Sequence, residues 1–421
     1  MTAMTMRPNS DAGVAGRMLD LARAVTGRPP AIRLRAWDGS EAGPADAPAL
    51  VLTDRAVLRR LFWRPGELSL ARAWATGEID VDGDLAEALR RARAEVVAAR
   101  RAPWRIRTGV GVRAAALGIR HGMLGRPPAR PEAEAVLAGR RHSRGRDRAA
   151  VAFHYDLSNE FYRLILDPSM AYSCAYWPED GSTDLAAAQR AKLDLICGKL
   201  GLLPGHRLLD IGCGWGSLTC HAARYYGARI TAITVSRMQY DFVAGRIAAE
   251  GLGDLIDLRL QDYRDPAGDS YDAVATVEMG EHVGADEYPT FAARLHDLVR
   301  PGGRVLVQQM SRGAARPGGG AFIEAYIAPD MHMRPLAATV SMLNGAGLEI
   351  YGVEAMRRHY GRTIRAWLTR LDAQWPVAVG LIGAQRARIW RLYLAGGAQA
   401  FEEGRMGVDQ ILAVRPEAGA R

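Results

Sequence analysis

The sequence is poor in cysteine and has no long apolar run. Its 421 residues contain four cysteines, which is too few for a disulfide framework and lacks the paired CxxC spacing of a structural zinc site. No run of about 18 apolar residues occurs, and the N-terminus lacks the apolar core of a secretory signal. These absences exclude a small stapled module and a membrane-spanning helix, and they predict a reduced, cytoplasmic protein.

Lysine is also nearly absent, because only Lys192 and Lys199 accompany the many arginines. We interpret this as a general bias toward arginine and give it no functional weight. The net charge of +9 is concentrated in one segment: residues 90–148 hold sixteen arginines against four acidic residues, a local balance of +12 that leaves −3 for the rest of the chain. A field of one sign over so short a segment predicts binding to a polyanion.

The length of the chain predicts two or three domains rather than one. From residue 184 to about 310, short apolar strands alternate with helices, which is typical of an α/β protein with a doubly wound parallel sheet. Residues 322–412 predict mostly helical insertions and a lid. We predict four successive parts: a flexible N-terminus over 1–30, a small α+β domain over 31–100, a basic amphipathic segment with a proline-rich linker over 101–149, and the largest domain over 150–421.

The strongest local motif is LLDIGCGWGS, residues 208–217. An apolar strand runs into Asp210, and three glycines then precede a helix: Gly212, Gly214 and Gly216. Glycines at such a turn let the backbone approach a ligand closely, and the free amides at the helix start favour an anionic group. The spacing is not the G-x-G-x-x-G dinucleotide fingerprint, and taken alone the loop is equally well a tight turn between strand and helix.

The glycine loop resembles motif I of class I S-adenosylmethionine (SAM) dependent methyltransferases, whose Rossmann-like fold would account for the alternating segment. The acid that usually ends the second strand is absent. Instead, ITVSRMQY at 233–240 resembles the cyclopropane fatty acid synthase family, in which Thr234 and Gln239 would hold the ribose. The resemblance covers roughly residues 150 to 405 through further motifs: FHYDLSNEFYRLILDPSMAYSCAYW (153–177), QDYRD (261–265), EMGEHVG (278–284), FIEAYI (322–327) and HYGRTIRAW (359–367).

The resemblance implies a SAM-dependent methyltransferase domain over 150–421 and a smaller, lipid-binding-like domain over 31–100. The cofactor it implies is SAM, and we expect no metal site. It places the cofactor against ten residues: Tyr172, Ser173, Asp210, Gly212, Gly214, Gly216, Thr234, Gln239, Tyr263 and Arg264.

The substrate that the resemblance implies is a cis alkene in a fatty acyl chain. Methyl transfer to such an alkene leaves a carbocation, which must be shielded from water and surrounded by aromatic faces. We expect these faces from six side chains: Tyr155, Tyr172, Tyr176, Trp177, Tyr326 and Tyr360.

A base must then remove a proton from the cation. In the family a bound bicarbonate does this, held by a cysteine, a glutamate, a histidine and a tyrosine; carried over, three of these are Cys174, Glu281 and Tyr360. Gln308 stands in place of the histidine and cannot carry a proton, which makes bicarbonate doubtful. Glu278 can serve as the base directly if burial raises its pKa, or it can equally contact the cofactor or cap a turn.

Two further residues accompany this set. His282 adjoins the catalytic glutamate, although its side chain can also face away from it. Cys174 is better interpreted as an anion ligand than as a nucleophile, because no general base is placed in the sequence to activate it.

The predicted function is transfer of a methyl(ene) group from SAM to the cis double bond of unsaturated acyl chains of membrane phospholipids. Because Gln308 and Glu278 depart from the family pattern, we favour a methylene branch, resembling the actinobacterial enzymes of 10-methyl (tuberculostearic-type) fatty acid synthesis, over a cyclopropane ring. A flavin- or nicotinamide-dependent reductase would then act on the product. A catalytically inactive lipid-binding or regulatory protein on the same fold is the alternative from another class.

The substrate must come from a bilayer, so the basic segment predicts peripheral attachment to the anionic inner face of the cell membrane. A solvated helical face or a dimerisation arm, and hence a homo-oligomer, is the competing interpretation. No recognised nucleic-acid-binding motif accompanies the arginines, and we expect no nucleic acid partner.

Overall fold

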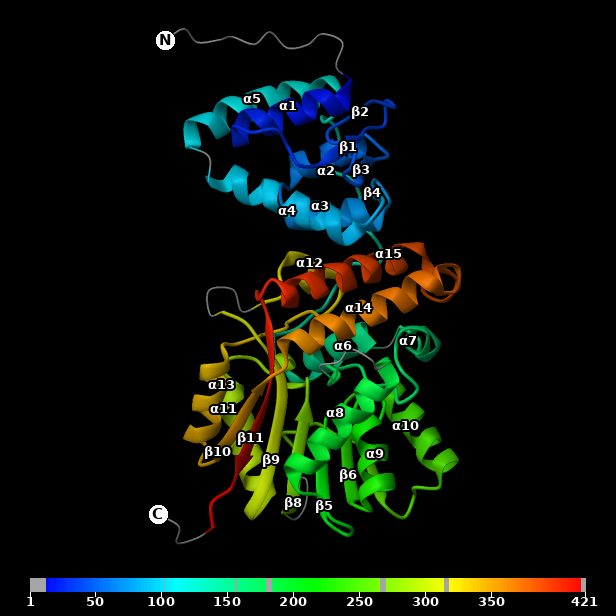
Figure 1. Ribbon diagram of the computed structural model, residues 1–421, viewed down its shortest axis with the longest axis vertical. Helices are drawn as coiled ribbons and strands as arrows, with labels where there is room; N and C mark the ends of the chain where they lie inside the picture. The colour runs from blue at the N-terminus through cyan, green and yellow to red at the C-terminus, as the bar shows by residue number, and fades with distance from the viewer. Residues whose placement is uncertain are drawn as a thin grey trace. The chain divides into compact units, whose positions relative to one another are not determined.

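The structure is a computed structural model that describes residues 13–101, 103–155, 157–178, 184–265, 270–313 and 318–417, with the backbone alone at 104–107. The chain divides into two compact units, Met1–Glu134 and Ala135–Arg421. Figure 1 shows that each unit consists of a sheet with helices packed around it.

The described part of the first unit has a four-stranded mixed sheet with the order β2-β1-β3-β4. β1 runs parallel to β3, and the other pairs are antiparallel. The strands are β1 (Arg33–Arg35), β2 (Glu41–Ala42), β3 (Ala49–Leu52) and β4 (Ile79–Asp82). The helices are α1 (Val14–Thr26), α2 (Ala56–Trp63), α3 (Glu67–Ala75), α4 (Leu85–Arg101) and α5 (Trp104–Arg120).

The prediction of a flexible N-terminus over 1–30 is wrong for residues 14–26, which form helix α1. Residues 1–12 lie outside the described part of the chain. The first backbone N–H groups of α1 donate to the side chains of Asp38 and Ser40 at 2.9 Å each. These bonds satisfy amides that a helix start leaves without an internal partner, and they anchor the helix to the β1–β2 turn.

The second unit is built on a seven-stranded sheet with the order β10-β11-β9-β8-β5-β6-β7. The five strands from β9 to β7 are parallel to one another, as predicted. β11 runs antiparallel to β9, and β10 runs antiparallel to β11. The strands are β5 (Arg207–Ile211), β6 (Arg229–Thr234), β7 (Ile256–Leu260), β8 (Tyr271–Val277), β9 (Val299–Ser311), β10 (Glu349–Ala355) and β11 (Gly407–Val414).

The helices of the second unit cover both faces of this sheet. Buried side chains of α8, α9 and α10 pack on one face, and those of α11 and α13 pack on the other. The helices are α6 (Arg144–Tyr155), α7 (Asn159–Ile165), α8 (Leu185–Leu200), α9 (Ser217–Tyr226), α10 (Arg237–Glu250), the 3-10 turn η1 (Gly280–His282), α11 (Tyr288–Leu298), α12 (Ala321–Tyr326), α13 (Leu336–Gly345), α14 (Arg357–Ala373) and α15 (Trp375–Glu402). The sequence pattern predicts helices over 185–200, 217–226 and 237–250, and these are the bounds of α8, α9 and α10.

The C-terminal region is less helical than predicted, because β10 and β11 extend the sheet there. β11 carries the polar residues Asp409 and Gln410, and both are buried. The Asp409 carboxylate accepts a hydrogen bond from the Ser311 hydroxyl (2.7 Å), and the Gln410 amide donates to Gln308 (2.9 Å). Buried polar residues with tertiary partners break the apolar pattern by which a central strand is recognised in a sequence.

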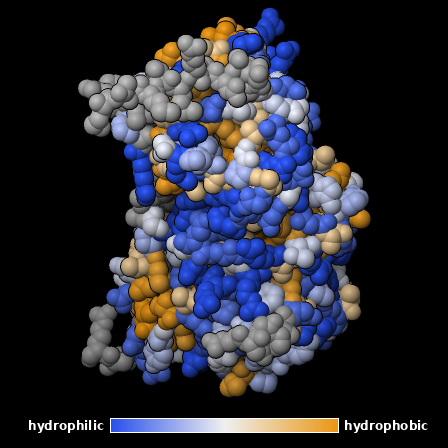
Figure 2. All heavy atoms as spheres, turned by 45° about the horizontal axis from the view of Figure 1, so that its top comes forward, coloured by the Kyte–Doolittle hydropathy of each residue, from blue (hydrophilic) through white to orange (hydrophobic). Residues whose placement is uncertain are grey.

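Helices α14 and α15 form an antiparallel hairpin that lies with α6 and α7 over one end of the large sheet (Figure 1). Among the described helices, none combines the length and the apolar character needed to cross a bilayer. Figure 2 shows that hydrophilic residues dominate the face turned toward the viewer, with hydrophobic residues in separate groups between them.

Candidate active site

The turn between β5 and α9 forms a backbone cradle at the carboxyl end of the sheet. Gly212, Gly214 and Gly216 have φ angles of 78°, 55° and 79°, a region that side chains disfavour. A Cβ atom on Gly212 would lie 2.9 Å from Cγ of Met279, and one on Gly216 would lie 3.1 Å from Cγ1 of Val243. At Gly214 a Cβ would meet no atom within 4 Å, because this residue borders an open cavity.

That cavity has a volume of about 140 Å³. Gly216 is absent from its lining and instead occupies the N-cap of α9. The Thr234 hydroxyl donates to the side-chain oxygen of Gln239 (2.9 Å), which orients that amide at the cavity wall. Apart from Gly216, all the residues predicted to bind the cofactor line the cavity: Tyr172, Ser173, Asp210, Gly212, Gly214, Thr234, Gln239, Tyr263 and Arg264.

Lys192 also lines the cavity, and the sequence interpretation missed it. Its side chain is 1% exposed, and its Nζ donates to the Ser173 hydroxyl at 2.9 Å. Burial lowers the pKa of Lys192, while the carboxylates of Glu278 and Asp210 act in the opposite direction. A buried ammonium group is costly unless a negative charge compensates it, so this lysine marks where an anionic part of a ligand would lie. The scarcity of lysine in the chain was the available signal.

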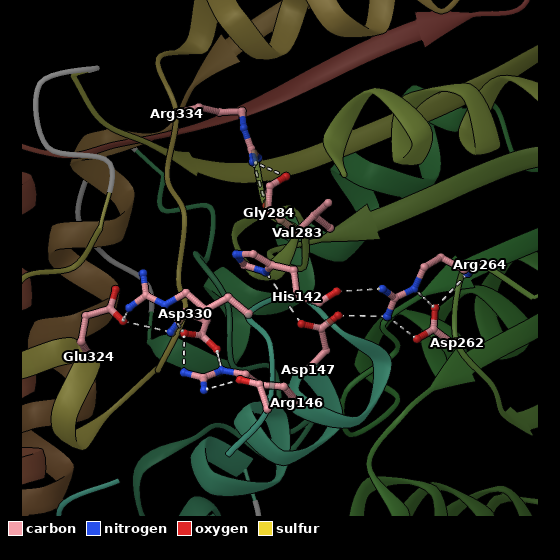
Figure 3. A network of polar contacts seen from close by, with 12 residues as sticks. His142, Arg146, Asp147, Asp262, Arg264, Val283, Gly284, Glu324, Asp330 and Arg334 are labelled. Carbon is pink, nitrogen blue, oxygen red and sulfur yellow. Dashed lines mark hydrogen bonds and ion pairs between the residues drawn. The ribbon is translucent and has the colours of Figure 1, made fainter. Parts of the chain in front are cut away.

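Arg264 does not present a free guanidinium to the cavity. It donates to Asp262 at 2.7 and 2.8 Å and to Asp147, on α6, at 2.9 Å (Figure 3). Burial raises the pKa of Asp262, but the bonds from Arg264 outweigh it and keep that pKa below its usual value. Figure 3 also shows Arg146 of α6 paired with Asp330. These ion pairs hold α6 in place, and its Tyr155 lines the same cavity.

A second group of predicted residues meets around the carboxylate of Glu278. One oxygen accepts the backbone N–H of Cys174 (2.7 Å) and the side-chain amide of Gln308 (2.8 Å), and the other accepts the hydroxyl of Tyr360 (2.5 Å). Burial raises the pKa of Glu278 although all three donors lower it. Glu278 has a φ of 53°, a strained conformation for a residue with a side chain. Strain of this kind is typical of a functional position.

Glu281 lies in the 3-10 turn η1 and is 1% exposed. One of its carboxylate oxygens accepts the backbone N–H of Met310, and the other has no hydrogen-bond partner among the described residues. Burial, followed by the charge of Glu278, raises the pKa of Glu281 to about 8. The protonated acid is therefore the main form of Glu281 at neutral pH.

The remaining two predicted residues have modest roles in this geometry. His282 lines the cavity with Nε2 3.5 Å from the hydroxyl of Tyr155, and burial lowers the pKa of His282 to about 4. The thiol of Cys174 lies near the carbonyl oxygens of Ala175 and Met356, and burial raises its pKa well above the usual range. A thiol in that state is a poor nucleophile.

Two side chains, Gln308 and Gln410, connect Glu278 to the other lysine of the chain, Lys199. Nζ of Lys199 donates to Oε1 of Gln410 (2.6 Å), and Nε2 of Gln410 donates to Oε1 of Gln308 (2.9 Å). An ammonium group can only donate hydrogen bonds, so the side-chain oxygen of Gln410 faces Lys199. The NH₂ group of Gln410 therefore faces Gln308, whose side-chain oxygen accepts its hydrogen bond. Gln308 is thereby left with its NH₂ group facing Glu278. Both lysines, to which the sequence interpretation gave no weight, thus lie beside the predicted site.

An aromatic cluster surrounds these carboxylates and the cavity. Of the six predicted aromatic side chains, five belong to it, and Tyr326 instead packs on Phe322. The ring of Tyr172 lies 5.1 Å from that of Trp367, and its hydroxyl donates to the hydroxyl of Tyr393 (3.3 Å). The sequence interpretation missed Trp215, which lies in the glycine turn, and four members whose helices resemble ordinary core: Trp367, Trp390, Tyr393 and Phe401.

The parallel sheet, the glycine cradle and the cavity beside it define a class I SAM-dependent methyltransferase. A family model described as mycolic acid cyclopropane synthetase matches residues 142–411, and the chain belongs to this family. A probable fatty acid methyltransferase of Pseudomonas putida is 36% identical over 395 residues, which cover 92% of each chain. A tuberculostearic acid methyltransferase of Mycobacterium tuberculosis is 37% identical over 287 residues, covering 65% of this chain and 66% of the relative.

Among solved structures, the mycolic acid cyclopropane synthase CmaA1 complexed with SAH and CTAB is similar with a TM-score of 0.60 and 29% identity. The match covers 63% of this chain and 98% of the other. Members of the family are SAM-dependent enzymes that methylate or cyclopropanate lipid acyl chains, and the cofactor of this chain is SAM.

The residues present fit this cofactor. The cradle that a Cβ on Gly212 would obstruct and the buried ammonium of Lys192 suit the amino acid part, and Thr234 with Gln239 suits the ribose. Bicarbonate fits less well. Two groups expected to hold that ion, Tyr360 and the amide in place of the histidine, donate to Glu278, and a second anion beside two carboxyl groups would be repelled.

Proposed function

We propose that this protein transfers a methyl(ene) group from SAM to the cis double bond of unsaturated acyl chains of membrane phospholipids and leaves a methylene branch of the 10-methylene type. Such a product is the precursor of a 10-methyl fatty acid. The single observation that supports the proposal most is the buried carboxylate of Glu278, which receives the donors that would otherwise bind an external anion.

SAM supplies the electrophilic methyl group. The chain's own residues must then stabilise the cation and remove a proton from it. The aromatic faces of Tyr172, Tyr360 and their neighbours exclude water and attract a positive charge, a contribution of about 0.5 to 2 kcal/mol per ring. After a hydride shift along the acyl chain, Glu278 takes a proton from the added methyl carbon, and the electrons of that C–H bond form the double bond of the methylene branch.

Glu278 rather than Glu281 carries the negative charge of the pair. Glu278 accepts three hydrogen bonds, whereas Glu281 accepts one, and the charge of Glu278 keeps Glu281 protonated. The orientation of Gln308, set through Gln410 by Lys199, presents a donor to Glu278 and so requires an accepting oxygen there. Glu278 is therefore the general base in this proposal, and Glu281 is a neutral neighbour.

The experiment is expression in a host whose lipids contain oleoyl chains but no branched or cyclopropane chains. Mass spectrometry with olefin-specific derivatisation then distinguishes the products. A fatty acid heavier by one methylene unit that still reacts as an olefin supports the proposal. Release of S-adenosylhomocysteine from the purified protein with oleoyl phospholipid tests turnover directly, and its absence would favour a lipid-binding or regulatory protein without catalysis.

A cyclopropane product is the second candidate. It arises from the same cation when the ring closes before any hydride shift, and the set of Cys174, Glu281 and Tyr360 that the family resemblance implies is compatible with it. In the same experiment, a product of equal mass that no longer reacts as an olefin would establish the cyclopropane.

We also propose that the basic segment over 101–149 attaches the protein to the inner face of the cell membrane. Helix α5 in this segment exposes Val112 (73%) and Ile119 (53%) beside Arg113 and Arg120. Apolar area together with arginine suits an anionic lipid surface. Neutralising Arg113 and Arg120 should weaken binding to anionic liposomes at low salt. A homo-oligomer formed through this segment is the competing interpretation, and light scattering tests it. A reductase that acts on the methylene product belongs to the proposal, and co-purification tests it.

A further inference from the structure

The turn of the α14–α15 hairpin carries an uncharged, partly exposed tip. Residues 373–385 (AQWPVAVGLIGAQ) contain no Asp, Glu, Lys, Arg or His. Within this tip Val377 is 52% exposed and Leu381 is 40% exposed. They are four positions apart in the first turns of α15, so they lie on one face of the helix. Figure 1 shows this turn at the end of the hairpin, near α7.

The opposite face of the tip is anchored in the protein. Ala378 and Ile382 are buried in the aromatic core cluster that also contains Trp367. The side chain of Gln374, at the start of the turn, donates to the carbonyl oxygen of Leu164 in α7. Near the C-terminal end of the tip, Gly383 interrupts α15 with a φ of 78°. The exposed apolar face is thus held in place by the core beneath it.

Arginines flank the tip on both sides. Arg370 precedes it, and Arg386, Arg388 and Arg391 follow it, against the single acid Asp372 in the whole stretch 370–391. That acid accepts a hydrogen bond from Arg391 at 2.8 Å, and the Arg391 guanidinium lies 5.6 Å from the ring centre of Trp375. The stretch therefore has a net charge of +3, with an uncharged centre. Arginine and tryptophan at the edges of an apolar face are typical of segments at a membrane–water interface.

We propose that this hairpin tip is a second membrane contact, which inserts Val377 and Leu381 among the acyl chains of an anionic leaflet while the flanking arginines bind the phosphates. The inference rests on the proposed function, because it concerns how the enzyme reaches a phospholipid substrate. It adds a contact within the catalytic unit to the one proposed for the basic segment. Helix α14 links the tip directly to Tyr360 near its other end, about 20 Å away at the rise of an α-helix.

A second copy of the chain fits this surface less well. A stable dimer interface takes about 20 to 30 residues from each side, and the uncharged tip offers 13 residues, some of which are buried in the core. The positive flanks would also face each other across a symmetric contact, and repel. A lipid surface needs only a few inserted side chains and supplies the negative charge.

The test is vesicle flotation of the full chain with the double variant Val377→Asp, Leu381→Asp. Vesicles of phosphatidylcholine with phosphatidylglycerol are used at about 0.1 M salt, and every protein compared carries neutral residues at Arg113 and Arg120, so that the basic segment contributes little while the arginines of the tip still act. We expect vesicle partitioning to fall at least tenfold. The matched control is Val353→Asp, which places a charge on a residue of β10 that is 44% exposed, and it should partition like the wild type. Equal partitioning of the tip variant and the wild type would overturn the proposal.

Further measurements exclude misfolding and a dimer contact. The tip variant should bind S-adenosylhomocysteine like the wild type, and quenching by brominated lipid should be reduced by Trp375→Phe; unreduced quenching would count against insertion. If light scattering shows a dimer that the tip variant breaks while vesicle binding is unchanged, the surface is an oligomer contact and the proposal is wrong.

Turnover separates this inference from the proposed function. If the hairpin tip contacts the membrane as proposed, the double variant should process phospholipid in detergent micelles at the wild-type rate but lose turnover on vesicles. If the wild type binds vesicles through the tip but processes phospholipid neither in micelles nor in vesicles, the proposed function is wrong and the proposed membrane contact is still supported.

Discussion

The cofactor cavity and the carboxylate group around Glu278 are neighbours built in different ways. The cavity takes its glycine-rich wall from the backbone of one contiguous loop, Asp210–Trp215, and the rest of its lining from several other segments. The carboxylate group depends on side chains far apart in sequence: Cys174 and Tyr360 are 104 and 82 positions from Glu278. The first feature is shared by a whole class of enzymes, whereas the second is the one to which our proposal assigns the choice of product. The following predictions test that division, from the largest expected effect to the smallest.

Glu278→Gln should reduce turnover by about a thousandfold, the usual contribution of a general base, because an amide cannot accept the proton. Affinity for S-adenosylhomocysteine should stay within about twofold of the wild type, since the cavity keeps its backbone. Calorimetry and product release measure the two quantities. The control is Glu349→Gln, an exposed carboxyl on β10. Turnover near the wild-type rate in Glu278→Gln would remove Glu278 from the mechanism.

The two lysines offer a matched pair. Lys192→Met removes a buried donor at the cavity, and we expect affinity for S-adenosylhomocysteine to fall by about ten- to a hundredfold, the range for a charge-assisted hydrogen bond. Lys199→Met should leave that affinity unchanged and lower turnover instead, because Lys199 does not line the cavity and reaches Glu278 through Gln410 and Gln308. If both variants lose affinity equally, the division between cavity and carboxylate group is wrong.

Gln410 should act as a positioning residue for Glu278. Gln410→Met breaks the chain from Lys199, and we expect turnover to fall about tenfold, with a shift in its pH profile, as for the loss of one oriented hydrogen bond. Gln410→Glu should be more harmful, because a carboxylate accepts from both sides and turns the oxygen of Gln308 toward Glu278. A purely structural role would change stability in both variants without moving the pH profile.

The last prediction concerns the free energy of unfolding and how much it changes per pH unit. The folded-state pKa of Glu281 is about 8, against an ordinary value of 4.5, so the folded protein retains a proton that the unfolded chain releases. This contribution is fully present below the unfolded pKa and is lost as the pH rises toward about 8, at about 1.4 kcal/mol per unit. Glu281→Gln should remove the slope. Urea unfolding at a series of pH values measures it, and parallel wild-type and variant curves would contradict the assignment.

Much of the cavity could be predicted from the sequence because its parts are local. The loop with Gly212, the pair Thr234 and Gln239, and the helices that follow each strand depend on neighbours within a few positions. Lys192 was missed because its signal, a rare residue type, was interpreted as composition. The strand β11 was missed because Asp409 and Gln410 are polar residues whose burial depends on partners in β9, and β10 was missed because its mostly exposed side chains give no core pattern.

By itself the sequence determined the parallel sheet, the glycine turn and the residue types available for acid–base chemistry, because hydrophobic periodicity and backbone conformation act over short distances. Only the tertiary structure decided which groups share a site. It brought the amide of Gln308 and the hydroxyl of Tyr360 to Glu278, oriented that amide through Lys199, and left one oxygen of Glu281 without a described partner. Hydrogen-bond partners and pKa values depend on burial and on atoms within a few ångströms, and distance along the chain says little about either.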